Sequence, residues 1–143
     1  FTKEYLAEKY NEIESAGMHL EVDIEVNKIM FDADKNAFRR IYENIINNSI
    51  KYNKKGTKIY FKMWKDKTLN IVIGDDGIGI DKEIKDRLFE PFVTSNKART
   101  SGEGTGLGLA IVKNFVELHD GEIVLVSKAH RKMKTEFLMK FKI

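Results

Sequence analysis

Glycine placement constrains the fold of this chain more than any other feature of its sequence. Seven of the ten glycines lie in two short clusters, one within residues 74–79 and one within residues 102–108. The single proline, Pro91, stands between them. Both residue types interrupt regular elements, so helices and strands are expected outside the clusters. The clusters themselves are candidates for turns that contact a ligand.

Composition places the chain among ordinary folded domains. Its 143 residues are 42% hydrophobic and 33% charged, which fits one domain and excludes a disordered chain. No apolar run approaches the ~20 residues of a membrane-spanning helix. The lack of cysteine excludes disulfides, a thiol nucleophile and cysteine-bound metals, and three scattered histidines argue against a histidine-rich metal centre. A net charge of +3 without a basic cluster does not favour nucleic acid as a partner.

The start of the chain indicates a piece of a larger protein. The first residue is Phe1 and not methionine, and no signal-peptide pattern follows it. We therefore expect residues 1–143 to form one domain, cut from a longer protein that works in the cytoplasm.

Hydrophobic periodicity predicts a mixture of helices and strands. The expected helices cover residues 3–15, 35–52, 82–89 and 107–118. The expected strands cover residues 18–25, 29–31, 58–65, 68–74, 122–127 and 135–143, and Met18, Leu20, Val22 and Ile24 share one face of the first. Asp34 is expected to cap the second helix, and the Asp66-Lys67 turn to close a hairpin. Hairpins outnumber βαβ units, which predicts an α+β sandwich with helices on one face of the sheet.

A polar stripe borders the apolar face of the helix expected over residues 35–52. Asn44, Asn48 and Lys51 fall within ~60° of one another on a helical projection. An asparagine carbonyl is a neutral oxygen ligand suited to Mg²⁺ that keeps waters and phosphate oxygens, and Lys51 is placed to meet a terminal phosphate. The alternative is that these amides only solvate a helix flank, and the stripe alone leaves both readings open.

The sequence GDDGIGI (residues 74–80) combines a carboxylate with closely spaced glycines. Strand alternation places Asp75 on the same inward face as Leu69, Ile71 and Ile73. A carboxylate among apolar groups needs hydrogen-bond donors, which an exocyclic amine and a water would supply. Gly77 and Gly79 permit a sharp turn and the close approach of a flat ligand. An ordinary acidic turn is the alternative, but the inward position of Asp75 favours a site.

The second glycine cluster precedes a helix, in GEGTGLGLAIVK (residues 102–113). Free N–H groups at such a helix start bind anions, and we expect phosphates here. The spacing matches neither the Walker A loop nor the dinucleotide fingerprint. A polar stretch over residues 94–104 predicts a lid, from which Lys97 and Arg99 can reach phosphates, although such stretches are often plain surface loops.

Taken in order, these segments resemble the ATP-binding catalytic domain of sensor histidine kinases. NIINNSIKYN (44–53) is similar to the family's asparagine box, DDGIGI (75–80) to its first glycine box, LFEPF (88–92) to its phenylalanine box and EGTGLGLAIVK (103–113) to its second glycine box. The wider superfamily includes gyrase, mismatch-repair and chaperone ATPases. The resemblance covers essentially the whole chain, and it implies a Bergerat-type two-layer α/β sandwich, with a mixed five-stranded sheet backed by three helices.

The resemblance also implies a role for each matching residue. Asn48 would ligate Mg²⁺ with support from Asn44, Lys51 would contact phosphate, and these three would form the catalytic set. Tyr52 would pack near the base, and Asp75 would take the adenine amine with Gly77 and Gly79 beneath the ring. The backbone of Gly106, Leu107 and Gly108 would hold phosphates, and Phe89 and Phe92 would dock the lid against the histidine-bearing helices. The remaining expected nucleotide contacts are Ile80, Lys97, Arg99, Gly104, Thr105, Leu109 and Thr135.

Departures from the family pattern make the expected activity more specific. Hydrolysing superfamily members carry a glutamate as general base where this chain has Asn44, and Glu43 points ~100° away. We therefore expect slow hydrolysis and transfer of the γ-phosphoryl group to another molecule. None of the three histidines, His19, His119 and His130, stands in the sequence context of the family's phosphate-accepting histidine. His119 is expected to be structural. The turn before Thr135 is also altered, with residues 131–134 replacing a Gly-x-Gly.

The expected partners follow from these departures. The acceptor histidine would lie on a separate dimerisation and phosphoacceptor domain of the same parent protein, and a response regulator would be reached through that domain. Residues 1–15 would be the linker or first helix after it, and the isolated domain would be monomeric. Whether the parent is anchored in the inner membrane is left open. The alternatives are an ATPase of the same fold and a nucleotide-binding regulator or serine kinase without a histidine acceptor.

Overall fold

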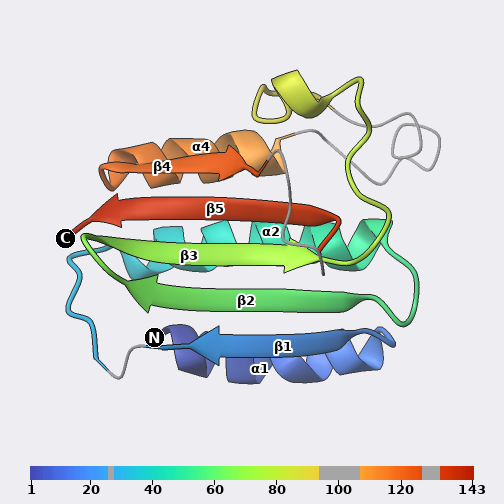
Figure 1. Cartoon of the computed structure of the whole chain (residues 1–143), viewed down its shortest axis with the longest axis horizontal. Helices are drawn as coiled ribbons and strands as arrows, with labels where there is room; N and C mark the ends of the chain where they lie inside the picture. Colours follow the sequence, from blue (N-terminus) through green and yellow to red (C-terminus); the bar gives the residue numbers. More distant parts are fainter. Residues whose placement is uncertain (26–27, 94–106, 127–132) are drawn as a thin grey trace.

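The chain folds as one sheet covered on one face by helices (Figure 1). The computed structural model describes residues 1–25, 28–93, 107–126 and 133–143. In chain order the elements are α1 (Thr2–Ser15), β1 (His19–Ile24), α2 (Lys35–Tyr52), β2 (Lys58–Lys65), β3 (Thr68–Asp75), the 3₁₀ turn η1 (Lys85–Arg87), α4 (Gly108–Leu118), β4 (Gly121–Leu125) and β5 (Thr135–Lys142). This architecture confirms the expected α+β sandwich.

The sheet is mixed and has five strands in the order β1-β2-β3-β5-β4. β1 pairs with β2 in parallel, and the other pairs are antiparallel. β2 and β3 form the expected hairpin, closed at Asp66, whose side chain accepts a hydrogen bond from the backbone of Thr68 at 3.0 Å. β3 is central, and its last residue, Asp75, lies opposite Thr135 of β5.

The helix α2 lies across the middle of the sheet and carries much of the core. Asp34 caps it as expected, accepting hydrogen bonds from the backbone of Asn36 at 2.8 Å and of Ala37 at 3.3 Å. The buried positions of α2 recur at helical spacing and are Ala37, Phe38, Ile41, Tyr42, Ile45, Ile46 and Ser49. Each fully buried large apolar side chain stabilises the fold by about 1.5–3 kcal/mol relative to exposure. α2 therefore has a fixed position on the sheet.

Histidine 119 joins α2 to the end of α4. Its Nδ1 lies 2.8 Å from the carbonyl of Phe115, and its Nε2 accepts from the backbone N–H of Asp34 at 3.1 Å. Only a neutral ring with its proton on Nδ1 satisfies both contacts. The ring also packs edge-on against Phe38, with centroids 5.1 Å apart. These contacts give His119 the structural role expected for it.

Two expected elements differ from their predictions. Residues 29–31 form no strand, because Ile29 and Phe31 are partly buried by packing against the core and not by strand pairing. The Phe31 ring lies 5.8 Å from Phe38 and 5.6 Å from Phe141, while Met30 is 83% exposed. The helix predicted over residues 82–89 is reduced to the short 3₁₀ helix η1, with bonds to the carbonyls of Asp81, Ile84 and Arg87 along this segment.

The first strand also buries less than its alternation predicts. Met18 and Leu20 are buried as expected, but Val22 is 48% exposed and Ile24 is partly buried. The reason is position, because β1 is an edge strand and α1 does not fully cover its end. Among the described residues, no helix is both long and apolar enough to cross a membrane.

Candidate functional site

Four chain segments that carry predicted site residues meet at one end of the sheet. Figure 1 shows the end of α2, the end of β3, the beginning of β5 and the beginning of α4 on the same side of the molecule. Their contacts agree: Asp75 of β3 is hydrogen-bonded to α2 and paired with β5, and the beginning of α4 faces α2.

Asn44 on α2 faces the first residue of α4. A Cβ added at Gly108 would lie 3.6 Å from the Asn44 side-chain oxygen, so α4 begins directly beside this amide. The Asn44 amide nitrogen is buried and has no hydrogen-bond partner among the described residues. An unsatisfied buried donor costs about 1–3 kcal/mol, so this position fits a polar ligand or water. Asn48 is half-buried one turn further along α2, and Lys51 is exposed at its end.

The N-terminus of α4 lies beside Asn44. Leu107 is its N-cap residue, and the Leu107 side chain makes no capping hydrogen bond. The first intrahelical bond runs from the N–H of Ile111 to the carbonyl of Leu107 at 3.0 Å. The N–H groups of the first turn have no acceptor within the helix, and together with the positive end of the helix dipole they favour an anion at this end of α4. Leu109, also predicted to contact nucleotide, is partly buried against the core.

Asp75 is buried at the end of β3 and is 3% exposed. Its Oδ2 accepts a hydrogen bond from the Ser49 hydroxyl at 2.8 Å, and its Oδ1 accepts from the backbone N–H of Gly77 at 3.0 Å. Burial raises the pKa of Asp75 above its usual value, and these hydrogen bonds oppose that rise. None of the ion pairs among the described residues involves Asp75. The carboxylate is thus held by neutral donors and keeps further acceptor capacity for a ligand.

The turn after Asp75 packs tightly against α2. Asn53 accepts from the N–H of Ile78 at 2.9 Å and donates to the carbonyl of Ser49 at 2.8 Å. A side chain at Gly77 would collide with the Asn53 amide, so glycine is required there. Gly79 adopts φ +78°, a left-handed conformation that glycine tolerates. Ile80 follows, partly buried against the core.

Ser49 and Asn53 are site residues that the sequence did not reveal. Both stand in the asparagine-box segment, four residues apart, and the only signal was this spacing next to Asn48. Their role depends on a turn 25 residues further along the chain, which periodicity alone cannot place beside them.

Thr135 and Tyr52 lie on the two elements that flank this turn. Thr135 is buried opposite Asp75, and the N–H of Lys134 donates to the Asp75 carbonyl at 2.7 Å. Tyr52 is partly buried at the last position of α2. Lys97, Arg99, Gly104, Thr105 and Gly106 lie outside the described residues.

The two phenylalanines of LFEPF behave differently. The Phe89 ring packs edge-on against Phe137, with centroids 6.1 Å apart. Phe92 is 73% exposed and has φ +66°, an uncommon conformation for an aromatic residue. Phe89 thus anchors this segment to the sheet, while Phe92 presents its ring to solvent.

Glu43 faces away from the Asn44 position, as the helical projection predicts. It lies near Tyr5 of α1, where its charge adds to the effect of burial in raising the pKa of Tyr5. The described residues also contain no group of three histidine, aspartate or glutamate side chains able to hold a metal. A cation beside Asn48 would therefore draw most of its ligands from elsewhere, as Mg²⁺ does when it is bound largely by phosphates and waters.

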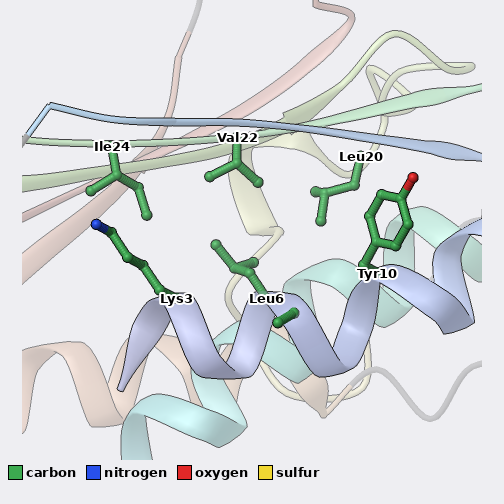
Figure 2. Close-up of a pocket in the computed structure, with 7 residues that line it drawn as sticks. Lys3, Leu6, Tyr10, Leu20, Val22 and Ile24 are labelled. Atoms are coloured by element: carbon green, nitrogen blue, oxygen red, sulfur yellow. The ribbon is translucent and has the colours of Figure 1, made fainter.

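An apolar groove of about 240 Å³ lies between α1 and β1 (Figure 2). Its lining consists of Lys3, Leu6, Ala7, Tyr10, Leu20, Val22 and Ile24. This lining offers a lysine and a phenol but none of the predicted site residues. The groove is therefore a separate feature from the site beside α2.

Comparison with known proteins identifies the class to which this fold and site belong. Residues 33–143 match the family described as "Histidine kinase-, DNA gyrase B-, and HSP90-like ATPase", and the chain belongs to this family. The matched region contains α2, β3 and α4, which carry the candidate site.

The named relatives of this chain include sensor histidine kinases. The chain is 34% identical over 116 residues to the histidine protein kinase DivJ of Caulobacter vibrioides, covering 80% of this chain and 19% of DivJ. It is 39% identical over 103 residues to the sensor histidine kinase YvrG of Bacillus subtilis, covering 71% of this chain and 18% of YvrG. The chain thus spans about a fifth of the length of these relatives.

The fold is that of a solved histidine kinase domain. The catalytic domain of histidine kinase ThkA superposes with a TM-score of 0.80 at 20% identity, over 98% of this chain and 88% of that domain. At this identity the likeness supports the fold alone.

Proposed function

We propose that this chain is the catalytic domain of a sensor histidine kinase, which binds Mg²⁺–ATP and donates the γ-phosphoryl group to a histidine on a separate domain. The observation that carries the proposal is the arrangement along α2. Its Asn44 amide nitrogen, which has no partner among the described residues, lies beside the start of α4, and its Ser49 donates to the Asp75 carboxylate further along the helix. A nucleotide with a base at Asp75 and phosphates at α4 would use both.

The phosphate end would be bound by backbone and amide groups. The N–H groups at the start of α4 provide an electrostatic site for anionic oxygens, and Lys51 adds a positive charge at the end of α2. Asn48, with Asn44 beside it, would offer amide oxygens to Mg²⁺. The ion, when bound, would neutralise charge on the phosphates.

The base end would be bound by Asp75. Its buried carboxylate accepts hydrogen bonds only, so it favours a ring that presents an amine, as adenine does. The missing side chain of Gly77 admits the Asn53 amide, and a Cβ at Gly79 would have no neighbour nearer than the Lys134 carbonyl at 3.7 Å, which leaves room for a flat ring beside Gly79.

Transfer would proceed by positioning and charge stabilisation. The bond from the γ-phosphorus to its bridging oxygen breaks and ADP leaves, while a phosphorus–nitrogen bond forms to the acceptor imidazole. The attacking nitrogen carries a lone pair and the proton on the other ring nitrogen passes to solvent, so no glutamate base is required. With Asn44 in place of that base and Glu43 turned toward α1, hydrolysis would be slow.

The partners would be the dimerisation and phosphoacceptor domain of the parent protein and, through it, a response regulator. Solved relatives support this: one structure holds histidine kinase ThkA in complex with the response regulator TrrA, and another holds ShkA in complex with AMPPNP. Residues 1–15 would connect to that domain through α1.

The test is calorimetric titration with ATP, with and without Mg²⁺, followed by transfer from γ-labelled ATP to the separately supplied acceptor domain. We expect ATP binding, label on the acceptor histidine, and little free phosphate without acceptor. Binding without transfer would indicate a nucleotide-binding regulator, and rapid phosphate release would indicate an ATPase. Either result would contradict the proposal.

A further inference from the structure

The base end of the proposed site contains a hydroxyl and an amide to which no role has been given. Ser49 and Asn53 lie four residues apart on α2, on the side that faces the turn after β3. Both belong to the helix that carries Asn44 and Asn48, but they contact the Asp75 turn and not the start of α4.

The Ser49 hydroxyl is buried, and its bond to Asp75 Oδ2, at 2.8 Å, is buried as well. The N–H of Gly77 holds the other carboxylate oxygen at 3.0 Å. Two donors on two oxygens fix the carboxylate plane, and acceptor capacity remains for a ligand.

Asn53 holds the other side of this arrangement. Its amide nitrogen donates to the Ser49 carbonyl and its oxygen accepts from the N–H of Ile78. The collision that any side chain at Gly77 would make with this amide shows how closely the turn and the helix approach. The Asn53 amide therefore sets where the turn lies relative to the Ser49 hydroxyl.

The charge state of Asp75 depends on these donors. Burial disfavours the ionised carboxylate, and the neighbouring charge of Asp76 acts in the same direction. The groups that oppose them are the Ser49 hydroxyl, the Gly77 N–H and the Asn53 amide. The residues that face Asp75 from β2 and β5 in the register are Ile59 and Thr135, which carry no charge.

We propose that Ser49 is a positioning residue for base recognition, which holds Asp75 as an oriented, acceptor-only carboxylate so that 6-amino purines bind in preference to 6-oxo purines. The proposal rests on the proposed function, since it requires a purine nucleotide at Asp75. An ionised carboxylate accepts from a 6-amino group and opposes a 6-oxo oxygen. A protonated one donates, and the discrimination would be lost.

The experiment compares Ser49→Ala with Ser49→Thr, which keeps the hydroxyl, and with Ser15→Ala, the same change on an exposed residue of α1. Calorimetry measures the dissociation constants for ATP, ITP and inorganic tripolyphosphate at neutral pH and over the acid range. Thermal unfolding checks that each variant is folded.

We expect Ser49→Ala to weaken ATP binding about tenfold, the effect of losing one hydrogen bond to a charged group. ITP and tripolyphosphate should bind as before, so that the preference for ATP over ITP falls by the same factor. As the pH is lowered, Ser49→Ala should lose ATP binding at a higher pH than the unmodified chain does, because its Asp75 carboxylate protonates more readily. Ser49→Thr should restore the preference, and Ser15→Ala should retain it.

Equal losses for ATP, ITP and tripolyphosphate would overturn the inference, as would an unchanged preference in Ser49→Ala. If Ser49→Ala fails to fold, Ser49→Cys keeps the volume with a weaker donor, and a normal preference there would also overturn it. A failure of the proposed function is distinguishable from these outcomes, because in that case the unmodified chain itself binds no ATP.

Discussion

At the scale of single residues, Asp75 and Asn44 share one property, which is that each buries a polar group without a charged partner. Asp75 is bonded only by neutral donors among the described residues, and the Asn44 amide nitrogen has no partner there. Such groups lower stability unless a ligand satisfies them, and they are typical of functional sites. Binding and stability are therefore expected to respond in opposite directions when they are replaced.

Asp75→Asn tests this opposition. Because the pKa of Asp75 is raised in the folded protein, the folded state binds more protons than the unfolded state between the usual carboxyl pKa and the raised value. Stability contributed by Asp75 is thus lost as pH rises through that window. The asparagine variant should be at least as stable as the unmodified chain at neutral pH, yet bind ATP at least about tenfold more weakly.

Urea unfolding and calorimetry measure the two effects. Tripolyphosphate serves as the control ligand, since it lacks a base and should bind the variant normally. A variant that is less stable at neutral pH, or that loses ATP and tripolyphosphate equally, would remove Asp75 from the base end of the site.

Asn48→Ala tests the proposed Mg²⁺ contact at the phosphate end of the site. If the Asn48 oxygen ligates Mg²⁺, the variant should lose the increase in ATP affinity that Mg²⁺ gives and should lose phosphoryl transfer to an added acceptor domain. The matched control is Asn36→Ala, on the exposed first turn of the same helix. Mg²⁺-dependent binding that persists in Asn48→Ala would show that this amide is not a ligand.

At the scale of elements, the β2–β3 hairpin positions Asp75 by fixing the register of β3. A hydrogen-bond network closes its turn: the buried Asn70 side chain, 1% exposed, donates to the exposed Asp66 at 3.0 Å and to the carbonyl of Thr68 at 3.1 Å. Bonds from Thr68 and Asn70 lower the pKa of Asp66 to about 2. The stability that this provides is present above the usual carboxyl pKa and is lost as pH falls toward 2.

Asn70→Ala should lower the free energy of unfolding by about 0.5–1.5 kcal/mol, because it removes the hydrogen bonds that the buried Asn70 amide donates at this turn. The pKa of Asp66 should rise toward its usual value, which a carboxyl NMR titration records. Lys67→Ala, on the exposed tip of the same turn, should change neither quantity. A stable Asn70→Ala with an unshifted Asp66 would show that the network does not hold the hairpin.

Elements with strong periodicity could be predicted, while those whose burial comes from irregular packing could not. α1, α2, α4 and the five strands lie close to their expected bounds. The prediction of a strand over residues 29–31 was wrong, because Phe31 is partly buried by aromatic rings from α2 and β5 and not by strand pairing. The alternation of β1 failed at Val22, since burial at a sheet edge depends on the covering helix.

The same limit applies to the site. Helical spacing and strand alternation placed Asn44, Asn48 and Asp75 correctly on their elements. The bonds of Ser49 and Asn53 to the Asp75 turn could not be predicted, because they require the distance between a helix and a strand end. These bonds form because the helix and the end of the strand come close together in the folded chain, and no local sequence pattern specifies that distance.

At the scale of the whole molecule, the sheet order explains why distant segments form one site. β3 and β5 are neighbours, so Asp75 and Thr135 meet at the same end of the sheet. α2 covers that sheet, and α4 begins beside it. The fold thus brings together the three segments that carry the candidate site, residues 44–53, 75–80 and 107–109. The chain does so although it spans only about a fifth of the length of relatives such as DivJ.

The most direct test of this arrangement is the map of backbone amide shifts on titration with Mg²⁺–ATP. We predict that the shifts concentrate on residues 44–53, 75–80 and 107–109, which come from three separate elements. The apolar groove between α1 and β1 provides the contrast, and Leu6, Tyr10 and Val22 should not shift. Shifts confined to that groove, or to only one of the three segments, would contradict a nucleotide site built along α2.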